Sequence, residues 1–248
     1  MAAEAGGEIL ALEEVVSGYG PLTVLNGASF KVKRGAITTV IGPNGAGKST
    51  LFKAIFGLLP VARGRIVFDG REISNRPPRV LLELGLSYVP QGRNVFPELS
   101  VLENLELGAS GAPGGVDVTE RIETALARFP ALRQKARAQA STLSGGQQKM
   151  LEIARALLVR PKLMLIDEPS IGLSPALVQD TFALLRELRA SGVSILMVEQ
   201  NAKRALEISD YGIVLELGRT RLADSAAAIL GDARVAQLFL GGAMAGVP

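Results

Sequence analysis

The 248-residue chain contains neither cysteine nor histidine. Catalysis by a Ser-His pair and zinc sites built from Cys or His are therefore excluded. Any general base has to be a carboxylate, a lysine or a tyrosine. The absence of cysteine also fits a reducing compartment.

Long apolar runs and strong charge are missing as well. No run reaches the roughly 18 residues that a membrane span needs, and Met1 to Gly7 lacks the basic start and apolar stretch of a signal peptide. A net charge of +3 and an aromatic content of 4% do not indicate a nucleic-acid partner. A hydrophobic content of 48% fits a globular protein with a full core.

A glycine-rich segment carries the most specific signal. It matches the phosphate-binding pattern G-x-x-x-x-G-K-[ST], and it lies between a β-branched stretch at 36–41 and an apolar helical pattern at 51–57. Glycines let backbone N–H groups approach phosphates, and the helix N-terminus favours the anion. We expect Lys48 to reach the β/γ-phosphates and Ser49 to ligate Mg²⁺. The expected nucleotide-binding residues are Gly42, Pro43, Asn44, Gly45, Ala46, Gly47, Lys48, Ser49 and Thr50.

Two acids follow an apolar strand predicted at 163–166. The strand carries Asp167 to the carboxyl edge of the sheet, where the phosphate loop also lies. There Asp167 can support Mg²⁺, through a water, and Glu168 can polarise a water that attacks the γ-phosphate.

The segment Leu-Ser-Gly-Gly-Gln precedes a helix predicted at 149–159. Ser144 and Gln147 have the spacing of a capping box. Gly145 and Gly146 are poor choices for an ordinary first helical turn, but they suit a phosphate that approaches the backbone. A capped helix start and an anion site are compatible.

Alternating strands and helices in the second half predict a mainly parallel sheet covered on both faces. Near the start, residues 9–16 and 28–33 predict an antiparallel edge sheet, and residues 65–69 another strand. Residues 108–119 are the most loop-like stretch, followed by an amphipathic helix at 119–129. Further helices are predicted at 175–189, capped by Ser174, and at 202–208, and strands at 194–198 and 211–216.

These three motifs, in this order, resemble the ATP-binding cassette family over almost the whole chain. The resemblance implies an α/β fold of the P-loop NTPase (RecA-like) type, with an N-terminal antiparallel β subdomain and an inserted helical subdomain. It implies one nucleotide-binding domain at 9–241, the helical subdomain at about 85–142, and tails at 1–8 and 242–248.

The family also implies ATP and Mg²⁺ as ligands and two cassettes that meet head to tail. Residues 143–147 resemble the signature of this family. ATP on the loop of one cassette is then covered by Ser144, Gly145, Gly146 and Gln147 of the other. Tyr19 is similar to the aromatic that stacks on adenine, or else it is a surface tyrosine. Gln91 resembles the glutamine that senses Mg²⁺ and the γ-phosphate beside the membrane subunit; by itself it would be a turn residue.

Residues 89–97, 198–202 and 239–242 are similar to the LivF-like ATPase subunits of branched-chain amino acid importers. This resemblance implies a peripheral subunit on the cytoplasmic face of the cell (inner) membrane, with transmembrane permease subunits, a second cassette subunit and a separate substrate-binding protein. The second cassette can be an identical or a different chain. Related importers carry urea, amides or other hydrophobic amino acids, so the cargo stays open.

Two positions depart from the family pattern. Gln200 stands where most cassettes have a histidine that contacts the γ-phosphate, and Ser174 stands where the usual loop ends in an aspartate. The expected catalytic residues are Lys48, Glu168 and, at the position of that histidine, Gln200. Gln200 can donate one hydrogen bond but carries no charge.

Three other functions fit the sequence less well. DNA-repair and chromosome cassettes carry a long coiled coil between the first motif and the signature, whereas fewer than a hundred residues without sustained heptads separate Lys48 from Leu143. Ribosomal cassette proteins join two cassettes, but this chain has one set of motifs. A scaffold without turnover is disfavoured by Lys48, Asp167 and Glu168.

Overall fold

The computed structural model describes residues 7–109 and 117–235. The predicted tails therefore lie almost wholly outside the described residues, as do 239–242 and most of the predicted loop at 108–119. The two ends of that loop belong to helices, because α3 (Val101–Ala109) ends in it and α4 (Val118–Arg128) begins in it.

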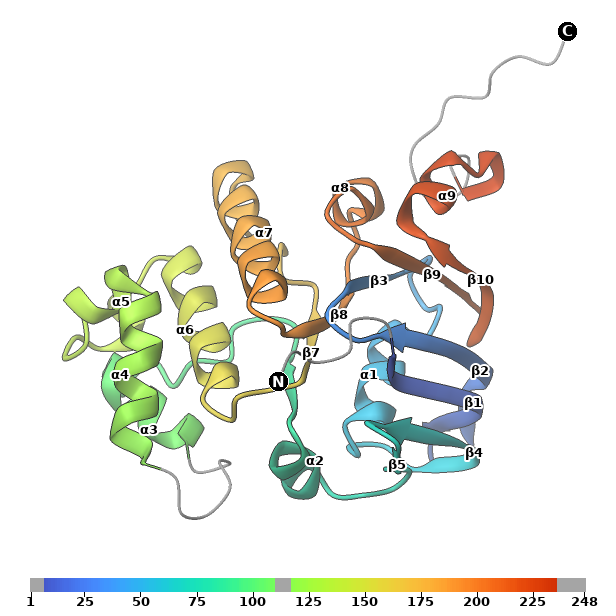
Figure 1. The fold of residues 1–248 in the computed structure, drawn as a ribbon, viewed down its shortest axis with the longest axis horizontal. Coiled ribbons are helices and arrows are strands. Elements are labelled where there is room, and N and C mark those ends of the chain that lie inside the picture. Colours follow the sequence, from blue (N-terminus) through green and yellow to red (C-terminus); the bar gives the residue numbers. More distant parts are fainter. Residues whose placement is uncertain (1–6, 110–116, 236–248) are drawn as a thin grey trace, which may run out of the picture.

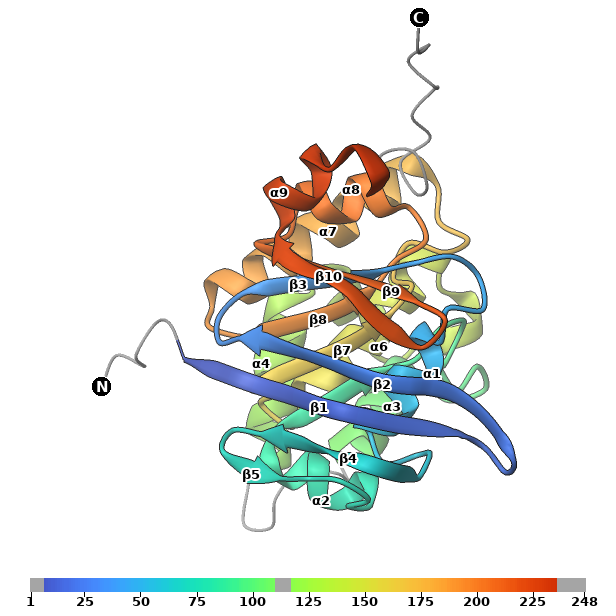
Figure 2. The same ribbon diagram turned by 90° about the vertical axis from the view of Figure 1, so that its right-hand side faces the viewer.

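Two sheets form the frame of the molecule (Figures 1 and 2). The antiparallel sheet has the order β2-β1-β4-β5, which confirms the predicted edge sheet near the start. Its strands are β1 (Glu8–Tyr19), β2 (Leu22–Lys33), β4 (Val61–Phe68) and β5 (Arg71–Glu72).

The larger sheet has the order β10-β9-β3-β8-β7-β6. The five strands from β9 to β6 are parallel, and β10 pairs antiparallel with β9, so the prediction of a mainly parallel sheet is confirmed. Its strands are β3 (Ile37–Ile41), β6 (Leu86–Val89), β7 (Leu163–Asp167), β8 (Ser194–Val198), β9 (Tyr211–Glu216) and β10 (Arg219–Ser225).

Strands β3, β7 and β8 are buried at every residue because both faces of the large sheet are covered. In β7, Leu163 and Leu165 face a core shared with α1 (Lys48–Ile55) and the antiparallel sheet. Met164 and Ile166 alternate to the opposite face. That face is covered by α6 (Gly145–Leu157), α7 (Pro175–Ala190) and α8 (Ala202–Glu207) (Figure 1). Beyond β10 follows α9 (Ala226–Gly231).

A group of helices lies at one end of the molecule, at the left of Figure 1. It contains α3, α4 and α5 (Pro130–Gln134), with the short turn of 3₁₀ helix at Ala140–Thr142. The amphipathic helix predicted at 119–129 is confirmed, with Ile122 and Leu126 buried. The range 85–142 also includes β6, which belongs to the large sheet, so the helices begin only at Val101. A further helix, α2 (Pro78–Leu84), precedes β6.

The sequence predicts side-chain caps at the N-termini of two helices, and the structure confirms one of them. Helix α6 begins at Gly145, earlier than predicted, and its capping box between Ser144 and Gln147 is confirmed. Ser174 precedes α7, but the prediction that its side chain caps this helix was wrong, because the hydroxyl makes no capping bond. Pro175 at the first helical position has no N–H to satisfy. The Ser174 carbonyl accepts from Val178 instead, at 3.0 Å.

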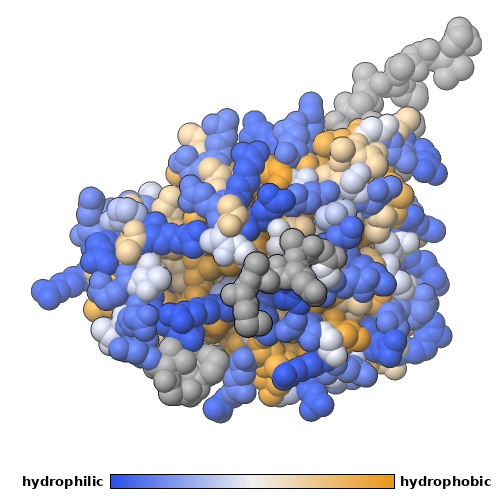
Figure 3. All heavy atoms as spheres, in the orientation of Figure 1, coloured by the Kyte–Doolittle hydropathy of each residue, from blue (hydrophilic) through white to orange (hydrophobic). Residues whose placement is uncertain are grey.

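The face seen in Figure 3 is largely hydrophilic, with apolar side chains in scattered patches. In the described part of the chain, no helix combines the length and apolar character that crossing a membrane requires.

Candidate active site

The glycine-rich loop joins β3 to α1, as the motif predicts. Gly45 and Gly47 have φ angles of 81° and 101°, which favour glycine. The Lys48 side chain folds back over the loop, and its ammonium donates to the carbonyls of Gly42 at 2.8 Å and Pro43 at 3.0 Å. Burial lowers the pKa of Lys48, and the nearby Glu168 and Asp167 carboxylates oppose this shift. The structure therefore brings the lysine and both acids together.

Asp167 ends β7 and is 1% exposed. One carboxylate oxygen, Oδ2, accepts a hydrogen bond from the Tyr88 hydroxyl at 3.4 Å, while Oδ1 has no partner within the described residues. Burial raises the pKa of Asp167, and the Ser49 and Tyr88 side chains oppose this shift. A buried carboxylate oxygen without a donor, next to a serine hydroxyl, is the kind of oxygen donor set that Mg²⁺ prefers.

Glu168 follows immediately, in a left-handed conformation with φ of 49°. Its N–H donates to the Val198 carbonyl at 2.9 Å, which ties the end of β7 to β8. The Gln91 side-chain amide, from the loop after β6, donates to Glu168 Oε2 at 2.7 Å. The two residues expected beside the γ-phosphate thus contact each other.

A cavity of about 380 Å³ opens beside Glu168. It also receives the exposed Gln200, which follows β8, so the predicted catalytic pair faces one space. The lining residues are Glu168, Ser170, Ile171, Gly172, Glu199, Gln200 and Asn201.

Glu199 is a residue of this site that sequence reasoning missed. It is 2% exposed and accepts hydrogen bonds from the Ser170 N–H and hydroxyl, each at 2.8 Å. Burial raises its pKa, and the donors of Ser170, Asn201 and Gln200 oppose the shift. The signal was available, because Glu199 directly follows the strand predicted at 194–198, as Asp167 follows the strand predicted at 163–166.

Tyr19 lies at the end of β1 with 44% of its surface exposed. Hydrogen bonding with the Thr50 side chain lowers the pKa of Tyr19, and Lys53 adds to this effect. The Lys53 ammonium donates to the Tyr19 hydroxyl at 3.3 Å. The exposed ring therefore stands beside the helix that follows the phosphate loop.

The signature segment lies elsewhere. Figure 1 shows α6, which begins at Gly145, on the other side of strands β7 and β8 from α1. A Cβ on Gly145 would make only an ordinary contact, 3.9 Å from the Leu173 side chain, but a Cβ on Gly146 would come within 2.5 Å of the Leu177 side chain. Gly146 is thus explained by packing of α6 on α7, and Gly145 remains the open position. The structure does not bring this segment to the phosphate loop of the same chain.

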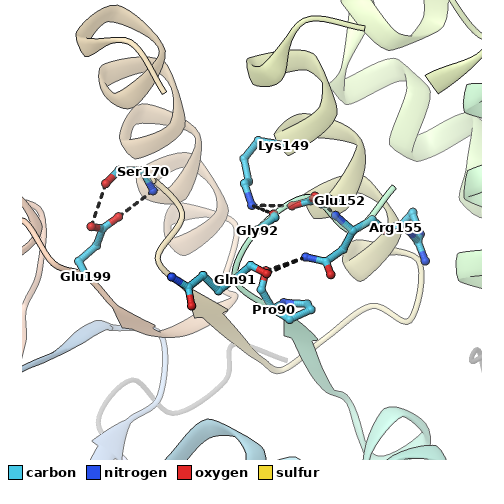
Figure 4. A network of polar contacts seen from close by, with 9 residues as sticks. Pro90, Gln91, Gly92, Lys149, Glu152, Arg155, Ser170 and Glu199 are labelled. Atoms are coloured by element: carbon cyan, nitrogen blue, oxygen red, sulfur yellow. Dashed lines mark hydrogen bonds and ion pairs between the residues drawn. The ribbon is translucent and has the colours of Figure 1, made fainter. Parts of the chain in front are cut away.

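Three charged residues of α6 hold the loop that follows Gln91 (Figure 4). Lys149 and Glu152 form an ion pair at 2.5 Å, with side chains 6% and 3% exposed. Lys149 donates to the Gly92 carbonyl at 3.3 Å, and Glu152 accepts from the Asn94 N–H at 2.6 Å. Arg155 donates to the Asn94 carbonyl at 2.6 Å. The signature helix and the Gln91 loop are thus joined through backbone atoms.

Comparison with known proteins decides the family. Residues 25–171 match the ABC transporter family. The chain is 41% identical over 234 residues to the high-affinity branched-chain amino acid transport ATP-binding protein BraG of Pseudomonas aeruginosa, covering 94% of this chain and 100% of BraG. The chain belongs to the ABC transporter family.

Other relatives agree with this membership. The chain is 41% identical over 226 residues to the probable branched-chain amino acid transport ATP-binding protein LivF of Archaeoglobus fulgidus, covering 91% of this chain and 95% of LivF. The crystal structure of the ADP conformation of an ATP-binding cassette of an ABC transporter superimposes with a TM-score of 0.85 at 33% identity, covering 95% of this chain and 100% of the cassette. The chain is thus an ATP-binding, ATP-hydrolysing cassette with a P-loop NTPase fold.

Proposed function

We propose that this cassette powers a membrane importer of branched-chain or other hydrophobic amino acids by hydrolysing ATP. One observation carries the proposal: Lys48, Asp167 and Glu168 meet at the carboxyl edge of the large sheet. They do so in a chain that aligns over nearly its whole length with branched-chain amino acid transport ATP-binding proteins.

Nucleotide binding is assigned to the loop at 42–50 and to Lys48, whose ammonium can exchange its two loop carbonyls for phosphate oxygens. Ser49 and Asp167 would hold Mg²⁺, and Gln91 would contact the metal site beside the γ-phosphate. The partnerless Oδ1 of Asp167 supports this fit. The exposed Tyr19 ring would stack on adenine.

Glu168 is proposed as the base that orients and deprotonates the attacking water. Its contact with Gln91 supports this role, because the amide donor fixes the orientation of the carboxylate. Gln200, which lines the same cavity, would donate a hydrogen bond to the γ-phosphate.

A second cassette, identical or different, is proposed to complete the site. The segment Ser144–Gln147 would then bind the partner's nucleotide through the open backbone at Gly145 and the positive end of α6. Its separation from the phosphate loop of its own chain supports action between subunits.

Transmembrane permease subunits and a separate substrate-binding protein are the other proposed partners, with the cassette on the cytoplasmic face of the cell membrane. A groove of about 210 Å³ between α2, β6 and α6 includes Leu82, Tyr88 and Arg155. Nearby, Phe96 is 46% exposed, whereas Val95 packs on the core. We propose that this end of the single domain at 9–241, with its helical subdomain within 85–142, contacts the permease.

Copurification and transport test the assignment. The chain would be purified from native membranes with its associated subunits, and the complex reconstituted into vesicles. We expect ATP-dependent uptake of leucine that is lost in Glu168→Gln. Uptake of urea or an amide, but not of leucine, would favour the related importers.

Because the chain has no native cysteine, single cysteines placed at 94–98 can be crosslinked cleanly. Capture of only DNA or ribosomal protein would contradict the importer.

A further inference from the structure

Glu199 carries a buried carboxylate. It is 2% exposed, and no lysine or arginine within residues 7–109 and 117–235 forms an ion pair with it. Burying an ionised carboxylate is costly unless hydrogen bonds compensate. The donors that surround Glu199 therefore define what it does.

Those donors come from the two segments that carry the proposed catalytic side chains, and Figure 4 shows the contacts of Glu199 with Ser170. Oε1 accepts from the Ser170 N–H at 2.8 Å, and Oε2 accepts from the Ser170 hydroxyl at 2.8 Å. Oε2 also accepts from the Gln200 N–H at 3.1 Å. Ser170 lies two residues after Glu168, so one carboxylate joins the chain beyond Glu168 to the start of the Gln200 segment.

The position of Glu168 depends on this junction. Its left-handed backbone turns the chain sharply after β7, a conformation that persists only where surrounding contacts impose it. One such contact is the bond from the Glu168 N–H to Val198, directly before Glu199. The Glu199–Ser170 contacts fix the other side of the turn. Without them, the segment 168–170 could move relative to Gln200.

We propose that Glu199 is a positioning residue that fixes Glu168 and Gln200 relative to each other in the lining of one cavity. The inference rests on the proposed catalytic roles of those two residues. Glu199 touches neither nucleotide nor water in this role. It acts by holding two backbone segments in the relative position that water attack on the γ-phosphate requires.

The test compares Glu199→Ala and Glu199→Gln with the parent, in the assembled transporter. The matched control is Glu13→Gln, because the Glu13 carboxylate also accepts two hydrogen bonds, from Arg65 at 2.7 and 3.0 Å, but at an exposed position of β1, outside the proposed catalytic and permease-contacting residues. We expect kcat of Glu199→Ala to fall about tenfold or more, with KM for ATP within about twofold of the parent's. Glu199→Gln, which keeps one acceptor oxygen, should lie between the two. The control should match the parent.

Two further readouts separate positioning from bulk stability. Hydrogen exchange at 168–172 should speed up in Glu199→Ala with ATP bound, while exchange in α3 stays unchanged. In a Glu168→Gln background, Glu199→Ala should cost little additional turnover, because the positioned group is already lost. A parent-like kcat, or equal losses of kcat, ATP affinity and thermal stability, would overturn the proposal. If Glu199→Ala does not fold, Glu199→Gln decides by the same measurements. Glu168→Gln with full turnover would instead refute the catalytic assignment, and the exchange measurement would still report on the junction.

Discussion

Gln91 and Glu168 are separated by 77 residues in the chain, yet a hydrogen bond of 2.7 Å joins their side chains. The contact exists because β6 and β7 are parallel neighbours, so the residues that follow them emerge at one edge of the sheet. The Gln91 loop is in turn held by Lys149, Glu152 and Arg155 of α6. The proposed base is thus linked by direct contacts to the helix that begins with the signature.

The base assignment predicts the behaviour of Glu168→Gln. The amide is isosteric but cannot accept a proton from water, so turnover should fall on the order of 10²–10⁴-fold while ATP binding persists. An ATP-bound dimer should accumulate, measured by size-exclusion chromatography with ATP. Parent-like hydrolysis would show that another residue is the base.

Removing the lysine of the phosphate loop should act on binding itself. Lys48→Ala is expected to weaken Mg-ATP affinity and abolish hydrolysis, because the ammonium that would neutralise phosphate charge is gone. The fold should remain intact by circular dichroism. Unchanged affinity, measured by isothermal titration calorimetry, would refute the role of Lys48.

The signature is predicted to serve the nucleotide of a second subunit. Ser144→Arg should block the ATP-bound dimer, because the added bulk obstructs the helix N-terminus. ATP affinity of the monomer should be nearly unchanged, since this segment lies away from its own phosphate loop. A loss of monomer affinity would instead mean that the segment serves its own site.

Gln200 predicts an asymmetric pair of ATPase subunits. A neutral amide should stabilise the transferring phosphoryl group less than a cation would. The chain alone should therefore turn over slowly, a partner cassette should raise turnover beyond the sum of the two, and Gln200→His should raise the rate of the isolated chain. Robust turnover by the chain alone, unchanged in Gln200→His and Gln200→Ala, would favour a self-sufficient homodimer.

The buried pair in α6 makes a stability prediction. Glu152→Ala leaves the Lys149 ammonium buried and unpaired, which should lower the free energy of unfolding by about 3–5 kcal/mol in urea denaturation. Changing both residues, to Met and Leu, should recover part of that loss. The exposed pair Arg79–Glu83 on α2 is the control, and breaking it should cost about 0–1 kcal/mol. Equal effects at both pairs would contradict the importance of burial.

The sequence predicted most of what local chemistry determines. Apolar strands, glycine spacing and the capping box each depend on residues close together in the chain, and the structure agrees there. The sequence alone did not predict β6, β10 or α2, whose stability comes from neighbours far away in the sequence. The sequence alone also did not show that Gly146 allows α6 to pack closely on α7, because Leu177 becomes its neighbour only in the folded chain. The place of Glu199 after a buried strand was visible in the sequence, but its donors on Ser170 and Gln200 are identified only by tertiary structure.

The strand order of the large sheet determines when the nucleotide site can form during synthesis. Strand β3, which presents the phosphate loop, lies between β8 and β9, whose residues 194–216 belong to the last quarter of the chain. While the ribosome is still making the middle of the protein, β3 therefore has neither neighbour and exposes two unpaired edges. We therefore expect the nucleotide site to form only late in the synthesis of the chain. A premature stop before β8 would release a fragment that has the complete glycine-rich motif but no site.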